Sequence, residues 1–430
     1  MSRLTHLGES IILIRLLDLV ITTKLRNVCY GLMFKFNISI MKNLVILTLL
    51  EIIILLVMTG CGGNTSTNSL VTVDVTKSSY SPKKELVLQD FMDVEYIPLE
   101  TKENFINQGV VEAIGEKYII VKNYGRDGDI FVYDRSGKAI RKINHKGQGG
   151  EEYLFCSGIT LDEENNEILV DDHIIKKVLV YDLEGNFKRS FKQKQTGGSQ
   201  CYWNIYNYDK DNLICYDELN KDTPFLIVSK MDGSITKEIK VPFKEKKLLF
   251  QILQHEKGTK VVGPGEYSRI IPFNGNWILL ELSSDTIYTL MSDYSLRPFI
   301  AKTPPIHTMN PEFHLILRLV TNRYYFMESI KNVFDFKKKE GFPKTHILYD
   351  TQENEFSSYI VYNRDYSSKK ELNMFMLSPI NSTGELCATL SAPDLCQDYK
   401  DGILKGKLKE IAAKLSEDDN GVIMLVKPKN

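Results

Sequence analysis

The stretch that decides the fold runs from Ile130 to Ile143 and reads IFVYDRSGKAIRKI. Copies of the same pattern follow further along the chain: VLVYDLEGNFKRSF from Val178 to Phe191, LIVSKMDGSITKEI from Leu226 to Ile239, and two weaker ones, TIYTLMSDYSLRPFI from Thr286 to Ile300 and ILYDTQENEFSSYI from Ile347 to Ile360. They recur at intervals of roughly 50 to 60 residues, and a period near 50 of strand-forming units is the signature of a β-propeller.

Each copy has the composition of a β-hairpin. In the first two, an Asp-x-x-Gly cluster divides two runs of alternating apolar and polar residues. Asp favours the first position of a turn, and Gly tolerates the positive φ of the bulge that follows. Further strand-like stretches precede the hairpins: YIIVKN (Tyr118 to Asn123), NEILVDD (Asn166 to Asp172), NLICYDE (Asn212 to Glu218) and NWILLEL (Asn276 to Leu282). Together they predict four-stranded blades, ordered from the inside of a ring outward.

The composition agrees with an all-β domain. The chain has 430 residues, a formal net charge of -1, 22 Tyr and 20 Phe. Aromatic side chains suit pleated surfaces. The near-zero net charge gives no support for a basic nucleic-acid-binding stripe, so we expect no nucleic-acid partner.

Six blades follow from five hairpin copies and the material after Ile360, where NMFMLSPI (Asn373 to Ile380) begins a sixth. The early strand VTVDV from Val71 and the late strand GVIMLVKPK from Gly421 are expected to complete one blade. Such closure would remove sheet edges that otherwise aggregate.

Two segments depart from the strand pattern. Residues 403–415 are predicted to be helical, because Leu404, Leu408, Ile411 and Leu415 fall on one helix face. Residues 304–338 are less regular and are interpreted as a long insertion between strands.

The segment MKNLVILTLLEIIILLVMTGCGG, which starts at Met41, reads as a secretory signal that ends in a lipobox-like Thr-Gly-Cys. Its apolar run from Leu44 to Met58 is shorter than the ~20 residues of a membrane span, which is the alternative interpretation. The sequence therefore predicts a signal peptide at residues 41–60 and a lipid on Cys61, although Glu51 interrupts the run and Met58 stands where Leu is preferred.

A polar tether at 61–70 and a propeller at 71–430 follow this signal. Residues 1–40 form a doubtful N-terminal extension. The favoured explanation is a start codon assigned too early, with Met41 as the true first residue, and the alternative is an N-terminal membrane-associated helix.

Five cysteines remain besides Cys61 and Cys29 of the extension: Cys156, Cys201, Cys215, Cys387 and Cys396. No CxxC occurs, which excludes a zinc ribbon or thioredoxin-like motif by spacing. An oxidising compartment would permit Cys201–Cys215 or Cys387–Cys396 disulfides, and buried free thiols are the alternative.

Several loops could carry chemistry. HKGQGGEEY (His145 to Tyr153) lacks the GxGxxG and GxxxxGK patterns of phosphate loops, so it is interpreted as a connection between blades, with Glu151 and Glu152 free to face the ring entrance. DEENNE (Asp162 to Glu167) lacks calcium-loop spacing and reads as a hairpin turn. Neither HExxH nor GxSxG occurs, and no catalytic residue is assigned.

Two further groups have a functional and a structural interpretation. Asp171-Asp172-His173 offers carboxylate and imidazole groups to a metal, but a strand alternates faces, so only alternate members can converge on one ion. A solvated loop is the alternative. The aromatic cluster of Trp203 with Tyr202, Tyr206 and Tyr208 could stack on sugar rings or pack in the strand core.

The chain resembles the six-bladed β-propeller lipoproteins of Bacteroides-type bacteria, relatives of the NHL-repeat-like and TolB-like propellers. The leader, FMDVEYIPLET (Phe91 to Thr101), the hairpin with its Gly-rich loop, and the ending LSEDDNGVIMLVKPK carry the likeness. Phe91 to Thr101 looks like the family's first outer strand. Gly150 and Gly421 stand where the resemblance leads us to expect proline.

The resemblance implies a fold and little function. The favoured interpretation is a binding or scaffolding module for a protein, peptide or glycan, lipid-anchored in the outer membrane of the cell envelope. Because GGNTST after Cys61 lacks an acidic cluster, the periplasmic side is favoured. Related six-bladed lactonases hold calcium in the central tunnel through Glu, Asn and Asp of different blades. The alternative is therefore a metal-dependent hydrolase or lactonase, whose metal ligands and cofactors the sequence does not identify.

Overall fold

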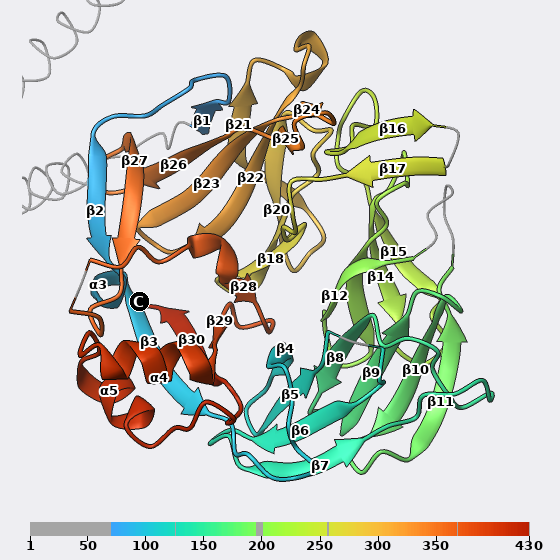
Figure 1. The fold of residues 1–430 in the computed structure, drawn as a ribbon. Coiled ribbons are helices and arrows are strands. Elements are labelled where there is room, and N and C mark those ends of the chain that lie inside the picture. Colours follow the sequence, from blue (N-terminus) through green and yellow to red (C-terminus); the bar gives the residue numbers. More distant parts are fainter. Residues whose placement is uncertain (1–69, 125, 195–200, 256–257, 368, 430) are drawn as a thin grey trace, which may run out of the picture. The chain divides into compact units, whose positions relative to one another are not determined.

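The computed structural model describes residues 70–429 apart from 125, 195–200, 256–257 and 368. The predicted extension, signal peptide and lipidation at Cys61 lie outside these residues. Within them, six four-stranded antiparallel sheets stand in a ring, which confirms the predicted six-bladed propeller (Figure 1).

Blades 1 to 6 are numbered from the first complete meander, and their strands are given from the innermost outward. Blade 1 holds β4 (Val110–Ile114), β5 (Tyr118–Lys122), β6 (Ile130–Asp134) and β7 (Ala139–Ile143); blade 2 holds β8 (Gly158–Asp162), β9 (Glu167–Asp172), β10 (Lys177–Asp182) and β11 (Phe187–Lys192); blade 3 holds β12 (Trp203–Asn207), β13 (Asn212–Tyr216), β14 (Phe225–Ser229) and β15 (Ile235–Ile239). Blade 4 holds β18 (Ile270–Phe273), β19 (Asn276–Leu279), β20 (Thr286–Leu290) and β21 (Leu296–Thr303); blade 5 holds β22 (Phe313–Val320), β23 (Tyr324–Lys331), β26 (Lys344–Asp350) and β27 (Glu355–Tyr362); blade 6 holds β28 (Ser378–Pro379), β29 (Leu386–Leu390), β30 (Val422–Pro428) and β3 (Met92–Pro98).

The five repeated hairpins are the two outer strands of blades 1 to 5, as predicted. In blade 1 the Asp134 carboxylate accepts hydrogen bonds from the backbone N–H of Ser136 at 2.9 Å and of Lys138 at 3.0 Å. Gly137 has φ +87°, and a Cβ there would lie 2.2 Å from the carbonyl oxygen of Pro98. The turn therefore needs glycine both for its backbone conformation and for the close approach of the neighbouring blade.

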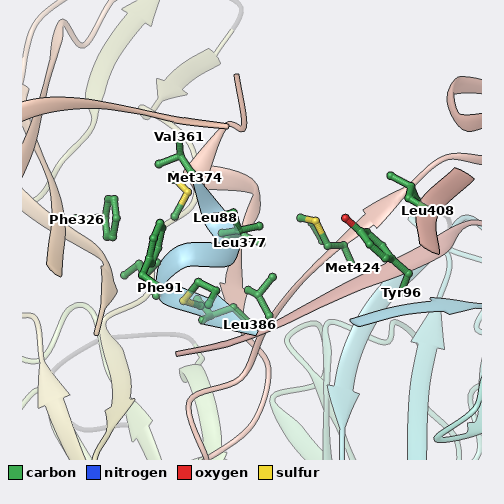
Figure 2. Packing of buried hydrophobic residues seen from close by; sticks show 14 of the residues in the cluster. Leu88, Phe91, Tyr96, Phe326, Val361, Met374, Leu377, Leu386, Leu408 and Met424 are labelled. Atoms are coloured by element: carbon green, nitrogen blue, oxygen red, sulfur yellow. The ribbon is translucent and has the colours of Figure 1, made fainter. Parts of the chain in front are cut away.

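Apolar side chains fill the space between blades. The cluster in Figure 2 joins blades 5 and 6, and the rings of Phe91 and Phe326 are stacked there with centroids 5.4 Å apart. Leu88, Phe326, Leu408 and Met424 are fully buried in it. Each such side chain contributes about 1.5–3 kcal/mol through burial, so contacts between neighbouring blades hold the ring together.

Ring closure differs from the prediction that VTVDV pairs with the last strand. Seven residues of β3 pair with β30, from Met92 opposite Pro428 to Pro98 opposite Val422. The VTVDV strand, β1 (Val71–Asp74), instead adds in parallel to β21. β3 pairs along all seven residues of β30, whereas β1 has four residues. The closing strand lies in the segment that the resemblance placed as the first outer strand.

The N-terminal segment thus adds one strand to each of three successive blades: a fifth strand to blades 4 and 5, and the fourth strand to blade 6. After β1 on blade 4, β2 (Lys83–Val87) adds in parallel to β27 of blade 5. The short helix α3 (Leu88–Phe91) then leads into β3 of blade 6 (Figure 1).

The predicted insertion at 304–338 is also wrong. After η1 (Ile306–Thr308), this segment forms β22 and β23, the two inner strands of blade 5. Charged residues within these two strands interrupt the apolar pattern that would have identified them as strands. The charges can be buried because they form ion pairs: Arg318 Nη2 lies 2.7 Å from a carboxylate oxygen of Glu328. The true insertions are two hairpins, β16 (Gln251–His255) with β17 (Gly258–Val262), and β24 (Phe334–Asp335) with β25 (Glu340–Gly341).

Helices gather between β29 and β30. They are α4 (Ala392–Lys400), which was not predicted, and α5 (Gly406–Ala412), which covers only the middle of the helix predicted at 403–415. Leu408 and Ile411 are buried on α5 as expected. Leu404 is buried ahead of the helix, in a β-bridge with Tyr366, and Leu415 follows its end. A short η2 (Met374–Met376) precedes β28. Among the helices of the described residues, none has the length and hydropathy needed to cross a membrane.

Candidate functional site

The antiparallel order of each blade assigns its loops to two faces of the ring. Loops between strands 2 and 3, together with the segments that lead from one blade to the next, lie at one end of the strands, which we name the connection face. Loops between strands 1 and 2 and between strands 3 and 4 lie at the other end, the turn face.

The turn face consists of short turns that are joined by hydrogen bonds to other turns. The carboxylate of Glu163 accepts hydrogen bonds from the backbone N–H groups of Glu116 (2.8 Å), Lys117 (2.9 Å) and Tyr118 (2.9 Å) of the adjacent blade. Arg135 Nη1 donates to the carbonyl oxygen of Gly115 at 2.8 Å. Side chains of these turns thus bind backbone groups within a blade and between neighbouring blades.

The predicted turn DEENNE also lies on this face, between β8 and β9. Its Asp162 carboxylate pairs with Lys230 Nζ at 2.7 Å, and both side chains are 3% exposed. Lys230 also donates to the carbonyl oxygens of Asp209 and Lys210. This buried pair joins blades 2 and 3, so the hairpin-turn interpretation is confirmed and the acid has a structural partner.

Exposed apolar side chains gather on the connection face. Its loops and inserted hairpin carry Ile106, Tyr124, Ile174, Leu219, Ile252, Leu253, Val261 and Met376, and Trp203 opens β12 at the same end. Turn-face loops carry Met231 and Tyr294. These residues belong to loops of several blades, and the connection face exposes more large apolar side chains than the turn face does.

Asp171, Asp172 and His173 lie on the connection face at the end of β9. His173 Nε2 is 2.6 Å from Asp171 Oδ2, as expected for alternate residues on one side of a strand. Asp172 Oδ2 instead accepts from the backbone N–H of Leu154 at 2.7 Å and of Phe155 at 3.1 Å, so it holds the incoming loop. The structure brings the first and third residues together and gives the second a structural role.

Residues of the segment that leads from blade 2 to blade 3 complete this cluster, and the sequence did not reveal them. Gln193 Nε2 donates to Asp171 Oδ1, and Gln193 Oε1 accepts from Tyr202 N at 3.0 Å. Cys201 hydrogen-bonds to His173. Burial alone would lower the pKa of His173, but the hydrogen bonds with Asp171 and Cys201 outweigh it and raise the pKa to about 10. His173 is therefore protonated near neutral pH, beside an Asp171 carboxyl whose own pKa is raised by burial.

The aromatic cluster divides into core and surface. Tyr202 is buried, and Tyr206 and Tyr208 pack on Trp277 with ring centroids 5.9 and 6.3 Å away, which confirms the core interpretation for these three. Trp203 is 41% exposed and meets the His173 ring edge-on at 5.0 Å. Of these four aromatic residues, Trp203 is the one classed as exposed.

The loop HKGQGGEEY connects blades 1 and 2, as predicted, and is closed on itself. Glu152 Oε2 accepts from Gly149 N at 2.7 Å, and a Cβ on Gly147 would collide with the same carboxylate. Buried Tyr153 donates to the carbonyl oxygen of Gly128 at 2.6 Å. Glu152 is therefore engaged by its own loop, and the glycines make room for it.

Carboxylates on and beside the inner strands pair with lysine or arginine side chains and do not converge on a common metal site. Glu112 lies 3.0 Å from Lys122 Nζ, and burial raises the pKa of the Glu112 carboxyl. Glu328 pairs with Arg318, and Glu218 with Arg269. Across the described residues, no group of three or more His, Cys, Asp or Glu side chains is placed to hold a metal ion.

Of the two alternatives for the cysteines, the structure agrees with buried free thiols. Cys387 and Cys396 are free and buried, and Cys215, on β13, is likewise free, so neither proposed pair is bonded. Cys215 and Cys387 contribute to the cores between blades. Burial raises the pKa of Cys215, which keeps this thiol protonated and unreactive.

Two hollows open among the connection-face loops. The smaller, of about 240 Å³, is lined by Lys122, Arg126 and Phe155, and its polar groups are largely engaged with one another. The larger has about 1440 Å³ of empty space open to solvent and lies between the two inserted hairpins. We name it the hairpin groove, and it is lined by Leu253, Val333, Phe334, Asp335, Phe336, Lys337, Lys338, Glu340, Gly341 and Pro343.

Comparison with known proteins agrees with this architecture. A family model described as "Domain of unknown function (DUF4934)" matches residues 70–427. A Bacteroides fragilis structure described as a "Putative exported protein" is similar with a TM-score of 0.54 and 17% identity, over 82% of this chain and 99% of that chain. A duf4221-family member from Bacteroides vulgatus gives a TM-score of 0.41 and 13% identity, over 80% of this chain and 99% of that chain. No curated protein matches the chain. At such identities the likeness concerns the fold alone.

Proposed function

We propose, from the premise that this chain belongs to the family of the DUF4934 domain, that it is an extracytoplasmic propeller whose connection face binds a protein, peptide or glycan. The observation that carries the proposal is the contrast between the faces. Exposed apolar residues and inserted hairpins lie on the connection face, while the turn face consists of short hydrogen-bonded turns. Function commonly resides on loops held by a rigid scaffold.

The proposal includes anchoring. Residues 41–60 would act as a signal peptide, and Cys61 would carry the lipid. The tether at 61–70 would then hold the propeller at the outer membrane, on its periplasmic side. The similarity to a Bacteroides protein described as exported supports an extracytoplasmic location. We also place the propeller among NHL-like and TolB-like relatives, on the strength of its repeated hairpin.

In-cell photo-crosslinking tests the binding role. A photo-reactive phenylalanine analogue is placed at Trp203 or Tyr124 on the connection face, and at Met231 or Tyr294 on the turn face, in the full chain. We expect discrete adducts from the first pair only, identified by mass spectrometry. Equal adducts from both faces, or none from the connection face, would overturn the proposal.

Fractionation tests the anchor separately. Wild-type protein is expected in the membrane fraction with a lipid-bearing peptide that begins at Cys61. Cys61→Ser should lose this modification, whereas Ser66→Ala, a matched control in the same tether, should not. A lipid retained by Cys61→Ser would contradict the anchoring model.

A further inference from the structure

We propose that the hairpin groove binds an extended, acidic segment of a partner protein. The inference rests on the proposed binding role of the connection face and names the chemistry of one partner. It is carried by three features of the described residues: a fixed pair of hairpins, an apolar lining, and a rim of lysines whose side chains have no ionic partner.

Hydrogen bonds fix the two hairpins to each other at their roots. Gln251, the first residue of β16, donates from Nε2 to the carbonyl oxygen of Asn332 at 2.9 Å and to its Oδ1 at 3.0 Å. Asn332 Nδ2 donates to the carbonyl oxygen of Leu248 at 3.1 Å. Asn332 is 7% exposed and directly follows β23. The groove therefore has preformed walls, which lowers the ordering cost of binding.

The lining is apolar at its centre. Leu253 of β16 is 38% exposed, a large fraction for leucine. On the facing hairpin, Phe334 and Phe336 meet edge-to-face with centroids 5.0 Å apart. Phe342 is buried behind them. An apolar side chain of a ligand would gain burial here without displacing a protein contact.

Lysines outnumber acids at the rim, three to two. Lys337 and Lys338 line the groove together with the acidic Asp335 and Glu340, and Lys339 follows them just outside the lining; all three lysines are exposed. The Asp335 carboxylate accepts from the backbone N–H of Lys337 at 2.9 Å and of Lys338 at 3.1 Å, so it serves the hairpin turn. None of the three ammonium groups pairs with a described acidic side chain. Such a rim attracts anionic groups and repels basic ones.

The backbone favours an extended ligand. The sheet of β16 and β17 has two strands, which pair only with each other among the described residues, so each keeps an unpaired outer edge. Unpaired edges accept an added strand, where main-chain hydrogen bonds supply affinity and alternate side chains supply specificity. A strand with apolar residues toward Leu253 and acidic residues toward the lysines fits both requirements.

Fluorescence anisotropy with the full chain in detergent tests the inference. The probe is a labelled peptide of alternating valine and glutamate, compared with one of alternating valine and lysine. We expect binding of the acidic peptide only, weakened by added salt. Binding should fall about tenfold in Lys337→Ala/Lys338→Ala/Lys339→Ala, as expected for three exposed ion pairs. Leu253→Ser should weaken it severalfold with the salt dependence unchanged.

The matched control removes the same charge from the turn face. Lys117→Ala/Lys138→Ala/Lys210→Ala should bind the peptide like wild type. Equal loss in both triple variants, or no binding of the acidic peptide, would overturn the inference. Groove-dependent binding of a heparin oligosaccharide without peptide binding would also overturn it, and assign the groove to an anionic glycan.

The two proposals fail separately. Adducts from Trp203 or Tyr124 with no binding of the acidic peptide would keep the binding role and reject the groove ligand. Adducts from both faces would reject the binding role whatever the peptide does.

Discussion

The two faces of the propeller are built from the same strands and have opposite character. On the turn face, residues 115–117 and 274–275 suffice to reverse the chain, and carboxylates such as Glu163 bind neighbouring turns. On the connection face, residues 240–269 link two blades and form a hairpin on the way. The turn face carries tight reversals within a blade, whereas the connection face also carries the passages between blades, which need no tight geometry. Variation, exposed apolar surface and candidate sites therefore collect on one side of the ring.

The largest effect should come from breaking the buried pair of the turn face. Lys230→Ala leaves the Asp162 carboxylate buried without its partner, and removing one member of such a pair typically costs 3–5 kcal/mol, here about 3 or more. Thermal and urea unfolding measure the loss. Lys210→Ala, an exposed lysine of the same region, is the control and should be nearly neutral. A neutral Lys230→Ala would show that the turn face does not depend on this pair.

The next largest difference is expected between two glycine substitutions, one on each face, in the free energy of unfolding. Gly137→Ala on the turn face introduces a Cβ at φ +87° and 2.2 Å from the Pro98 carbonyl oxygen, so we expect a loss of about 2 kcal/mol. Gly150→Ala on the connection face has no heavy atom within 4 Å of the new Cβ, and its stability should change by less than about 0.5 kcal/mol. Similar values for both variants in urea unfolding would contradict the contrast.

A smaller, pH-dependent effect is expected from His173 on the connection face. Its folded pKa is raised to about 10 by Asp171 and Cys201 despite burial, above the ordinary value of 6.5. The stabilisation is therefore complete below about pH 6.5 and lost as pH rises through about 10. We expect about 1 kcal/mol after allowing for partial exposure.

NMR titration of the imidazole and melting temperatures from pH 6 to 10 measure this effect. Asp171→Asn should lower the His173 pKa and flatten the pH dependence of melting. An imidazole that titrates near 6.5 in the wild type would disprove the pair.

The smallest effect should come from exposed apolar residues of the connection face. Ile174 is 52% exposed, and Ile174→Ser should change unfolding stability by no more than about 0.5 kcal/mol. Val180→Ser, a fully buried control on β10 of the same blade, should cost several times more. A large effect of Ile174→Ser in thermal melts would mean that this surface serves the fold and not a partner.

The sequence predicted parts of the candidate site and missed the rest for a physical reason. Asp171 and His173 stand two apart on a strand, so their meeting follows from local geometry. Gln193 and Cys201 reach them from the segment leading to blade 3, and no local pattern encodes that contact. The lysine run at 337–339 is plain in the sequence, but the facing hairpin that places Lys337 and Lys338 in the wall of a groove is not.

The sequence by itself determined the architecture, because the repeated hairpin at 130–143 encodes strand, turn and bulge locally, and repetition encodes the ring. Tertiary structure alone decided which strand closes the ring. Both VTVDV and the segment at Phe91 have suitable local patterns, and only register against β30 and packing between blades separate them. Tertiary structure also decided that Arg318 and Glu328 lie inside strands, since a buried charge is tolerated only where the fold supplies its partner.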